Sequence, residues 1–338
     1  MTALIDLTAL RANLAVIRTR VAPAEPMIVV KADAYGHGLE RVADVLVDEG
    51  IGWIGALDLE TAVRLRETVP PSVRLFVWLA DPAETMPEGL DLGVSTLAQL
   101  EAARGHGSRI HLKIDTGLHR AGASVEEWPG LVARALELQE SGELELVGAW
   151  THIAEASDDE DSAAIARFHV AVAIAEAQGA VFEVKHLAAS AASFARADAR
   201  LDLVRIGAFA YGIAPGDGIG PAELGLTPVM TLTAPVLASS GGVTTLGVGT
   251  ADGLQERLAD RVTVAIAGQR FPVTEVEIDT LLVDTGDRSF EAGETAYLWG
   301  SGDHGEATLQ EWADATGTIG EELVTRLGRR VAREYLAG

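Results

Sequence analysis

The sequence predicts an α/β protein that begins with a (β/α)8 barrel and continues into a mainly antiparallel β domain. Two observations predict this fold class. Eight short apolar runs alternate with helix-like segments over residues 27–212, and continuous apolar runs are typical of buried parallel strands. After Pro215 the strand-like runs are separated by short Gly/Asp turns instead, which is the pattern of an antiparallel sheet.

The predicted barrel strands recur at regular intervals along the chain. They span residues 27–31, 52–57, 74–80, 92–96, 109–117, 146–153, 183–190 and 203–212. Most of them are followed by a segment whose apolar residues recur with the period of a helix. Eight strand–helix units are the number that closes a parallel barrel. We therefore expect a TIM-like barrel domain over residues 10–218.

The predicted β domain comprises residues 219–338 together with residues 1–9. Its strand-like runs are 227–239, 261–268, 271–284 and 295–300. A helical segment over residues 317–336 is expected to close the chain.

The composition favours a soluble cytoplasmic protein. The net charge of −24 disfavours nucleic acid and anionic membrane surfaces as partners. The chain has no cysteine, so disulfides and thiolate metal sites are excluded, and no metal is expected. The N-terminal residues lack the pattern of a signal peptide, and no apolar run reaches the length of a membrane span.

Chemically capable residues gather at the predicted strand ends, where barrel enzymes have their active sites. Lys31 ends the first strand, and burying a lysine there is costly unless it is paired or used. A single buried histidine or arginine is more often only a satisfied hydrogen-bonding group, so the prediction depends on the whole set. The other members are Lys113, Asp115 and Arg120 near the fifth strand, His152 at the sixth, His186 and Ser190 at the seventh, and Arg205 and Gly207 at the eighth.

Two features of this set indicate a cofactor. The loops after the last two barrel strands often bind phosphate through backbone N–H groups and a hydroxyl, and Ser190 and Gly207 supply suitable residues. Lys31 offers an amine whose pKa burial would lower, which favours a covalent bond to an aldehyde. A phosphate-bearing aldehyde cofactor would use both features.

Motifs spread over nearly the whole chain resemble those of the alanine racemase family, the barrel-fold (fold type III) pyridoxal 5'-phosphate enzymes. The blocks are VVKADAYGHGL, HLKIDTGLHRAG, THIA, HLAAS, DLVRIGAFAYGIAP, TADG and GSGDHGEATLQEWADATGTIGEELVTRLGRRVAREY. The resemblance implies interconversion of L- and D-alanine, which supplies D-alanine to the cell wall. It also implies a cytoplasmic homodimer in which the β domain of one subunit completes the active site of the other.

The resemblance assigns catalytic roles to four residues. Lys31 would carry the cofactor and act as one of two bases for the α-proton. Arg120 would contact the cofactor hydroxyl and the substrate carboxylate, and Lys113 matches a lysine that is carbamylated in many members and orients that arginine. Asp279 matches an aspartate that the partner subunit supplies, although the methionine that usually precedes it is Ile278 here.

The resemblance also assigns the cofactor-binding residues. Arg205 would bond the pyridine nitrogen, and His152 would lie against the cofactor ring. The residues carried over for the phosphate are Tyr35, Ser190, Gly207, Ala208 and Tyr335.

One departure from the family is large. The second base of the family is a tyrosine that should precede the TADG turn, but only SGGVTTLGVG joins the flanking blocks, and the tyrosine usual in that turn is Thr250. None of the four tyrosines lies between residues 212 and 296. We therefore expect weakened racemisation, unless water, Thr245, Thr250 or His304 substitutes. The alternative is a non-racemising paralogue with one-base chemistry on D-amino acids, or a cofactor-binding or regulatory role.

Overall fold

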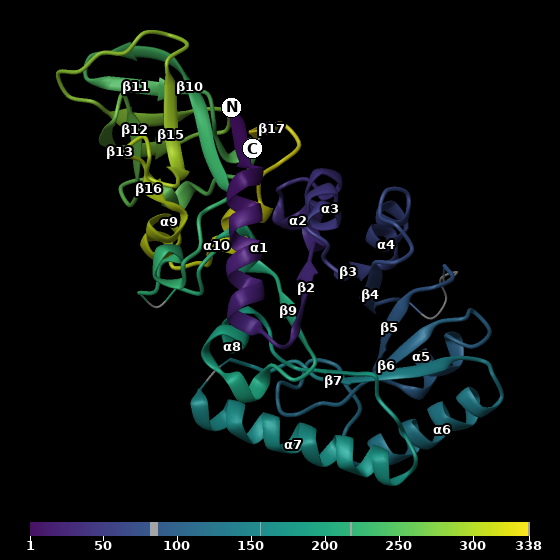
Figure 1. The fold of residues 1–338 in the computed structure, drawn as a ribbon. Helices are drawn as coiled ribbons and strands as arrows, with labels where there is room; N and C mark the ends of the chain where they lie inside the picture. The colour runs from purple at the N-terminus through teal and green to yellow at the C-terminus, as the bar shows by residue number, and fades with distance from the viewer. Residues whose placement is uncertain (82–86, 156, 217, 337–338) are drawn as a thin grey trace. The chain divides into compact units, whose positions relative to one another are not determined.

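A computed structural model shows the fold of the chain and describes residues 1–81, 87–155, 157–216 and 218–336 (Figure 1). One unit contains an eight-stranded parallel sheet that closes on itself. In sheet order its strands are β8 (Val184–His186), β7 (Glu145–Trp150), β6 (Arg109–Lys113), β5 (Asp91–Val94), β4 (Arg74–Leu79), β3 (Trp53–Asp58), β2 (Glu25–Val29) and β9 (Leu203–Ile206). The Arg205 N–H donates to the Ala188 carbonyl at 3.1 Å and so joins β9 to the end of β8. The predicted barrel is confirmed.

Helices connect the barrel strands, and α6 and α7 run along the outside of the barrel (Figure 1). The helices up to the last barrel strand are α1 (Leu7–Val21), α2 (Lys31–Tyr35), α3 (Leu39–Asp48), α4 (Leu59–Arg66), α5 (Leu97–Ala102), α6 (Trp128–Glu140), α7 (Asp158–Ala177) and α8 (Ser190–Ala195). The long helix α7 begins after Ser157, whose hydroxyl accepts the Glu160 N–H at 3.2 Å. Over the described residues, no helix combines the length and apolar character needed to cross a membrane.

Large apolar side chains fill the interior of the barrel. They come from strands on opposite sides of the ring and are Met27, Trp53, Phe76, Trp150, Val184 and Leu203, with Trp78 packed against them. The strands are buried along most of their length, as expected for a parallel sheet covered on both faces. This packed interior holds the strand ends in place.

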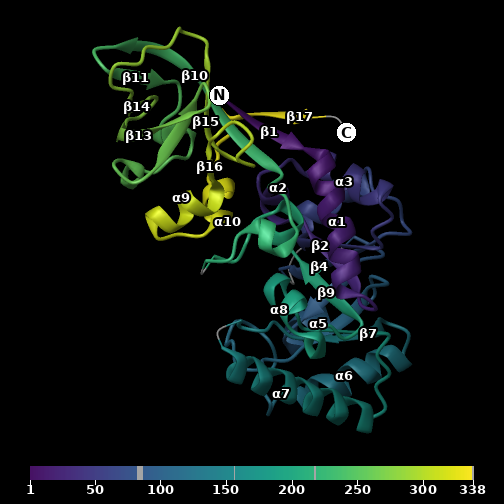
Figure 2. The same ribbon diagram turned by 60° about the vertical axis from the view of Figure 1, so that its left-hand side comes forward.

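The other unit contains a nine-stranded, mainly antiparallel sheet (Figure 2). In sheet order its strands are β16 (Ala307–Thr308), β15 (Thr295–Gly300), β12 (Thr263–Ile266), β13 (Gln269–Val276), β14 (Leu281–Asp284), β11 (Val243–Leu246), β10 (Met230–Ser240), β1 (Thr2–Asp6) and β17 (Ala332–Leu336). A further pairing of β10 with β15 closes part of the sheet on itself. Two helices follow, α9 (Leu309–Thr316) and α10 (Gly320–Thr325). The predicted β domain is confirmed.

Two predicted elements of this unit are wrong. The helical segment expected over 317–336 is helical only in α10, and its last residues form β17, which pairs in parallel with β1. The open edge of β1 offers backbone partners that local helix propensity cannot match. The strand expected over 271–284 is two strands, β13 and β14, which pair antiparallel around a turn closed by the Glu277 N–H and the Thr280 carbonyl.

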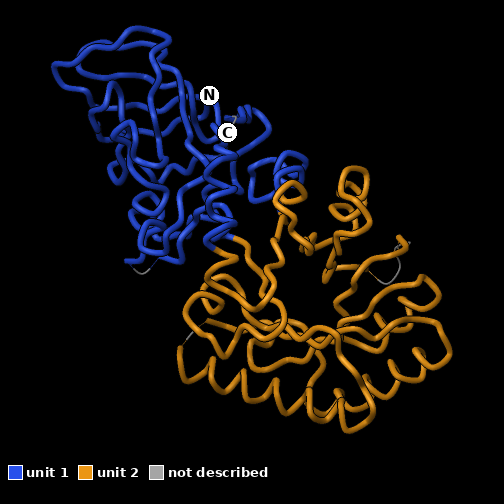
Figure 3. The backbone as a smooth tube through the Cα atoms, in the orientation of Figure 1, with its two compact units in different colours: residues 1–16, 32–45, 208–338 blue, residues 17–31, 46–207 orange. Residues whose placement is uncertain are grey.

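The two compact units interleave along the chain (Figure 3). The barrel unit comprises residues 17–31 and 46–207, and the other unit comprises residues 1–16, 32–45 and 208–338. This division differs from the predicted domain boundary at residues 218 and 219, because α2, most of α3 and the start of α1 group with the β strands. Two of the four points where the chain passes between units therefore lie directly after Lys31 and directly after Gly207.

Candidate active site

The ends of the barrel strands carry the polar residues predicted from the sequence. Lys113 is the last residue of β6, and His186 is the last residue of β8. Lys31 lies two residues beyond β2, and Gly207 directly follows β9. The remaining members of the barrel unit are Arg120 after β6, His152 after β7, Ser190 at the start of α8 and Arg205 within β9. Because all eight strands are parallel, these ends lie at one end of the barrel.

The chain turns sharply after Lys31 through a left-handed stretch. Residues 32–35, none of them glycine, have φ values between 52° and 56°. This conformation costs roughly 1–2 kcal/mol per residue for L-amino acids, and it persists only where surrounding contacts enforce it. One such contact is the Leu39 N–H, which donates to the Asp33 carboxylate at 3.0 Å.

The two glycines of the YGHG motif allow close approach of other segments of the same unit. A Cβ at Gly36 would lie 2.7 Å from the Val324 carbonyl oxygen of α10, and a Cβ at Gly38 would overlap the Tyr335 hydroxyl. Both glycines also have positive φ values, 78° and 94°, which other residues rarely adopt. Packing and backbone conformation therefore both require glycine at positions 36 and 38.

Arg205 is buried and surrounded by acceptors of the barrel interior. Its guanidinium donates to the carbonyls of Thr151 and Leu187, both at 3.0 Å, and to His152 Nδ1 at 3.1 Å. It also donates to His186 Nδ1 at 3.1 Å. Burial lowers the pKa of Arg205 to about 9, so the guanidinium is still charged at neutral pH.

Two neutral histidines extend this contact along the barrel interior. Because Arg205 can only donate, His186 accepts at Nδ1 and carries its hydrogen on Nε2. That hydrogen is donated to His111 Nδ1 at 3.0 Å, and His111 Nε2 in turn donates to Asp91 at 3.0 Å. Burial lowers the pKa of both histidines, and the Arg205 charge lowers that of His186 further. In this series each residue therefore donates to the next, from Arg205 through His186 and His111 to Asp91.

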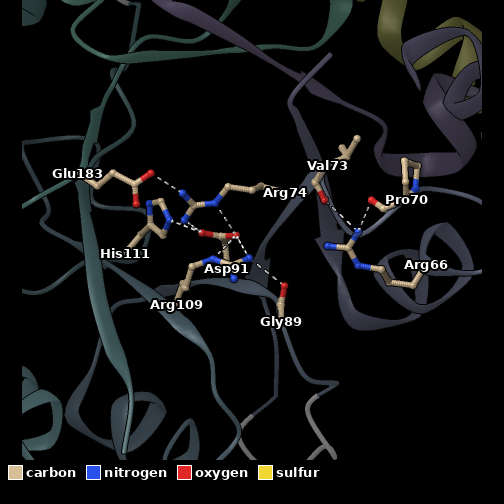
Figure 4. A network of polar contacts seen from close by, with 9 residues as sticks. All are labelled: Arg66, Pro70, Val73, Arg74, Gly89, Asp91, Arg109, His111 and Glu183. Atoms are coloured by element: carbon tan, nitrogen blue, oxygen red, sulfur yellow. Dashed lines mark hydrogen bonds and ion pairs between the residues drawn. The ribbon is translucent and has the colours of Figure 1, made fainter. Parts of the chain in front are cut away.

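Asp91 closes the opposite end of this chain, at the first residue of β5 (Figure 4). Its fully buried carboxylate accepts from His111, from Arg74 and from Arg109, the last at 2.8 Å. Burial alone would raise the pKa of Asp91, but these hydrogen bonds outweigh it and hold the pKa well below its usual range. Arg74 also reaches the exposed Glu183 at 2.7 Å. An ion-paired cluster thus anchors the histidine pair.

Replacing Asp91 by alanine is expected to destabilise the barrel by about 3–5 kcal/mol, because it leaves two partly buried arginines and the buried His111 without their shared partner. The depressed pKa means that this contribution is fully present above the unfolded-state pKa of about 4 and is lost as the pH falls below it. Urea unfolding at neutral and at acidic pH measures both effects.

The matched control for that substitution is Glu183→Ala, which removes another carboxylate bonded to Arg74. Glu183 is 58% exposed, so its loss should change stability by no more than about 1 kcal/mol. Equal effects of the two substitutions, or an Asp91→Ala deficit that persists unchanged into acid, would contradict the assignment.

The pKa of His152 shows that the strand-end site is positively charged. Burial and, after it, four nearby cations together lower this pKa to about 2. These cations are Arg205, Arg120, Lys113 and Lys31. A protein with a net charge of −24 thus gathers positive charge at this end of its barrel, which fits an anionic ligand.

Lys113 is oriented within the barrel unit by Arg120. Its Nζ donates to the Arg120 carbonyl at 2.8 Å and lies 4.7 Å from the centre of the Trp150 ring. Burial together with Arg205 and Arg120 lowers the pKa of Lys113 to about 8, partly opposed by Asp115. The amine is therefore more nucleophilic near neutral pH than that of an exposed lysine.

Ser190 and Gly207 lie together, as predicted. The Gly207 N–H donates to the Ser190 hydroxyl at 3.0 Å. Ser190 is also the first residue of α8, where backbone N–H groups lack partners within the helix. A hydroxyl and neighbouring N–H groups suit a phosphate.

The other unit carries the remaining predicted site residues. Tyr35 is buried, with its ring 5.0 Å from that of Tyr211. Tyr335 lies in β17, with Arg41 over its ring at 5.4 Å. Ala208 begins a short 3-10 helix (Ala208–Tyr211). Asp279 lies in the turn between β13 and β14, is exposed, and pairs with Arg330 at 2.7 Å.

A tight hairpin lies at the start of the segment SGGVTTLGVG. Ser240 of β10 pairs directly with Val243 of β11, and Gly241 and Gly242 form the turn between them. Both glycines have positive φ values, 61° and 85°, as a two-residue hairpin turn requires. A regular hairpin thus joins the two strands without any longer loop.

Sequence analysis missed His111 and Asp91. The signal for His111 was present, because it stands two residues before Lys113 on one strand and therefore points to the same side of the sheet. Asp91 gave no such signal, since its partners come from the starts of neighbouring strands. His186 was predicted, but as a residue of the rim rather than as a link to Arg205.

Comparisons with known proteins agree with this architecture. The family model for the alanine racemase N-terminal domain matches residues 5–215, and that for the C-terminal domain matches residues 234–335. An alanine racemase of Streptomyces coelicolor is 39% identical over 370 residues, covering 98% of this chain and 95% of the relative. One of Mycobacterium tuberculosis is 33% identical, with the same coverages.

Solved structures agree as well. Alanine racemase from Streptomyces lavendulae superposes with a TM-score of 0.94 at 34% identity, covering 100% of this chain and 97% of that one. The Corynebacterium glutamicum enzyme gives 0.91 at 32% identity, covering 99% of each chain. A barrel with this lysine-bearing rim, joined to an antiparallel β domain, defines an amino-acid racemase-type isomerase. The chain belongs to the alanine racemase family.

Proposed function

We propose that this chain is a pyridoxal 5'-phosphate enzyme that acts at the α-carbon of a small amino acid, with alanine as the substrate by family. The observation that carries the proposal is the cationic site of the barrel unit, in which Lys31, Lys113, Arg120 and Arg205 all act on His152. Both the cofactor phosphate and the substrate carboxylate are anions, so both suit this site.

The donor set fits this cofactor. An amine, a guanidinium and a hydroxyl beside a backbone N–H match an aldehyde, a ring nitrogen and a phosphate. Lys31 would hold the aldehyde carbon, Arg205 the pyridine nitrogen, and His152 would lie against the ring. For the phosphate we propose Ser190 and Gly207 of the barrel unit, with Tyr35, Ala208 and Tyr335 of the other unit.

When bound, the cofactor would withdraw electrons from the α-carbon and so acidify its proton. Lys31 would remove and return that proton on one face. Arg205 would donate to the ring nitrogen, and its charge keeps that atom unprotonated. Arg120 would orient the substrate carboxylate, and Asp279 of a partner subunit would approach the same site.

Racemisation also needs a group that delivers a proton on the opposite face. The chain has no tyrosine between residues 212 and 296, and the hairpin turn at Gly241 and Gly242 supports the absence of a loop that could carry one. The alignment with the Streptomyces coelicolor protein spans 370 residues, more than the 338 of this chain. We therefore propose inversion slower than that of a two-base enzyme.

This absence also favours a second candidate function. A protein with Lys31 alone would exchange the α-proton of D-amino acids without inverting them, or would bind the cofactor in a regulatory role. Measuring inversion and α-proton exchange on the same samples separates the two functions, because only the racemase couples them.

Carbamylation of Lys113 is a proposal that its chemistry supports. The neutral amine adds to the carbon of CO2 and loses one proton, so the reaction requires the unprotonated form. Because the pKa of Lys113 is lowered to about 8, we expect the modified fraction to rise as the pH increases through that value. Carbon-13 NMR of protein equilibrated with labelled bicarbonate measures it as a carbamate signal.

The control substitutions for this signal are Lys113→Gln and Lys185→Gln. The signal should vanish in the first and persist in the second, because Lys185 is only partly buried and pairs only loosely with Glu176, at 3.8 Å. A spectrum of Lys113→Gln identical to that of the unaltered chain would refute the modification.

By family we also propose a cytoplasmic homodimer that supplies D-alanine for the cell wall. Sedimentation of the purified chain tests the dimer.

A further inference from the structure

The loop that carries Arg120 leaves the barrel and returns to it at one place. The Asp115 N–H donates to the Ala123 carbonyl at 2.9 Å, and the Ala123 N–H donates to the Lys113 carbonyl at 2.8 Å. Residues 116–122 therefore form a closed loop beyond the end of β6. Arg120 lies within this loop and is exposed, so the loop backbone decides where its guanidinium can reach.

The backbone on both sides of Arg120 is strained. His119 and Ala121 have φ values of 56° and 59°, in the left-handed region that is unfavourable for residues with a Cβ. Such a conformation persists only where surrounding contacts enforce it. The contacts that fix this loop therefore also fix Arg120.

Thr116, the first residue of the loop, joins it to two other elements of the barrel unit. Its hydroxyl lies 3.0 Å from the Thr151 hydroxyl, and both residues are buried. Its carbonyl accepts from the Arg167 guanidinium of α7 at 2.8 Å. Gly117 permits this approach, because a Cβ there would lie 2.9 Å from Arg167 Nη1. The start of the loop is thus tied to α7 and to the end of β7.

Thr151 connects this hydroxyl pair to the proposed donor for the cofactor ring nitrogen. It directly follows β7, and its carbonyl accepts from Arg205 at 3.0 Å. The next residue, His152, accepts from the same guanidinium at 3.1 Å. One buried hydroxyl pair therefore links the loop that carries Arg120 to the segment that holds Arg205.

We propose that Thr116 and Thr151 are a pair of positioning residues that set the affinity of the site for the substrate carboxylate. The proposal rests on the proposed function, because that function assigns the carboxylate to Arg120. Each hydroxyl can donate one hydrogen and accept another, and a buried hydroxyl that loses its partner leaves an unsatisfied polar group. The pair therefore favours a single position of the loop, and with it a single starting point for the Arg120 side chain.

The test uses the full-length, cofactor-loaded chain and propionate as the probe, because propionate has the carboxylate of alanine but no amino group. Calorimetry gives its dissociation constant. Thr116→Val removes the hydroxyl at nearly constant volume and should raise this constant roughly three- to tenfold, the equivalent of one neutral hydrogen bond. The KM of D-alanine in α-proton exchange should rise by a similar factor with little change in kcat.

The matched control is Thr244→Val, which breaks another buried hydroxyl pair. The hydroxyls of Thr244 and Thr285 lie 3.1 Å apart in the other unit. This control should lose stability as Thr116→Val does, but it should keep the propionate affinity and the KM. Thr116→Ser retains a hydroxyl and should restore most of the affinity. Circular dichroism shows whether each variant is folded.

Further substitutions test whether the two hydroxyls act as one unit. Thr151→Val should raise the dissociation constant as Thr116→Val does, and the double variant should be little worse than either single variant. Arg167→Gln removes the other bond to Thr116. Because Arg167 is exposed, this variant can be measured even if a buried substitution prevents folding, and it should also weaken propionate binding.

The outcomes separate the inference from the proposed function. Unchanged propionate affinity in a folded Thr116→Val variant would overturn the inference while leaving the proposed function intact. So would fully additive losses in the double variant, because two independent hydroxyls are not a pair. An unaltered chain that binds neither pyridoxal 5'-phosphate nor propionate would overturn the proposed function and the inference together.

Discussion

Lys31→Ala is expected to abolish cofactor-linked visible absorbance and all exchange of the substrate α-proton. The residue is proposed both to hold the cofactor covalently and to move the proton, so one substitution removes two roles. Loss of the proton-transfer role alone would slow exchange by about 10²–10⁴-fold. Absorbance spectra and the rate of deuterium entry into D-alanine measure the two roles separately.

Lys185→Ala is the control for this substitution, because Lys185 also lies in a barrel strand but is only partly buried and loosely paired. It should keep both the absorbance and the exchange. Added methylamine offers a further check, since a small amine that enters the vacated space should restore part of the exchange in Lys31→Ala. Unaltered absorbance in Lys31→Ala would show that another residue holds the cofactor.

The second large effect is expected when inversion and exchange are measured together in deuterium oxide. Lys31 can return a deuteron only to the face from which it took the proton, so D-alanine should gain deuterium faster than it inverts, by about 10²–10⁴-fold. Chiral chromatography gives the enantiomer ratio, and mass spectrometry of the same samples gives the α-deuterium content.

Thr250→Val and His304→Ala test whether another group replaces the tyrosine. Thr250 stands in the TADG turn, and the His304 ring stacks on Tyr297 with 4.0 Å between centroids. If neither donor is used, both variants should keep the slow inversion of the unaltered chain. Inversion as fast as exchange, from either enantiomer, would refute the proposed lack of a second base.

The predicted elements that were correct depend on local patterns. The apolar runs of the barrel strands and the turns of the β domain are visible within a few residues of sequence, so the α/β class and the positions of Lys31, Lys113 and Arg205 near strand ends could be predicted. The C-terminal residues could not, since Tyr335 lies in a strand only because β1, more than three hundred positions earlier, pairs with it.

The site residues also fall into those that the sequence could predict and those that it could not. Residue types and motifs were sufficient to select Lys31, His152, Ser190 and Arg205, because each stands beside a recognisable strand or turn. The direction in which Arg205 is held was not predictable. Its link to Asp91 passes through His186 and His111, which lie 75 positions apart in sequence and 3.0 Å apart in space.

The chain's family, its barrel, its lysine and the absence of a tyrosine between residues 212 and 296 follow from the sequence alone, because motifs and residue counts are properties of the chain order. Tertiary structure decided the rest. Closure of the barrel brings the partly buried Arg74 and Arg109 to the buried carboxylate of Asp91. Electrostatic interactions depend on distance in space, and only the folded chain sets that distance.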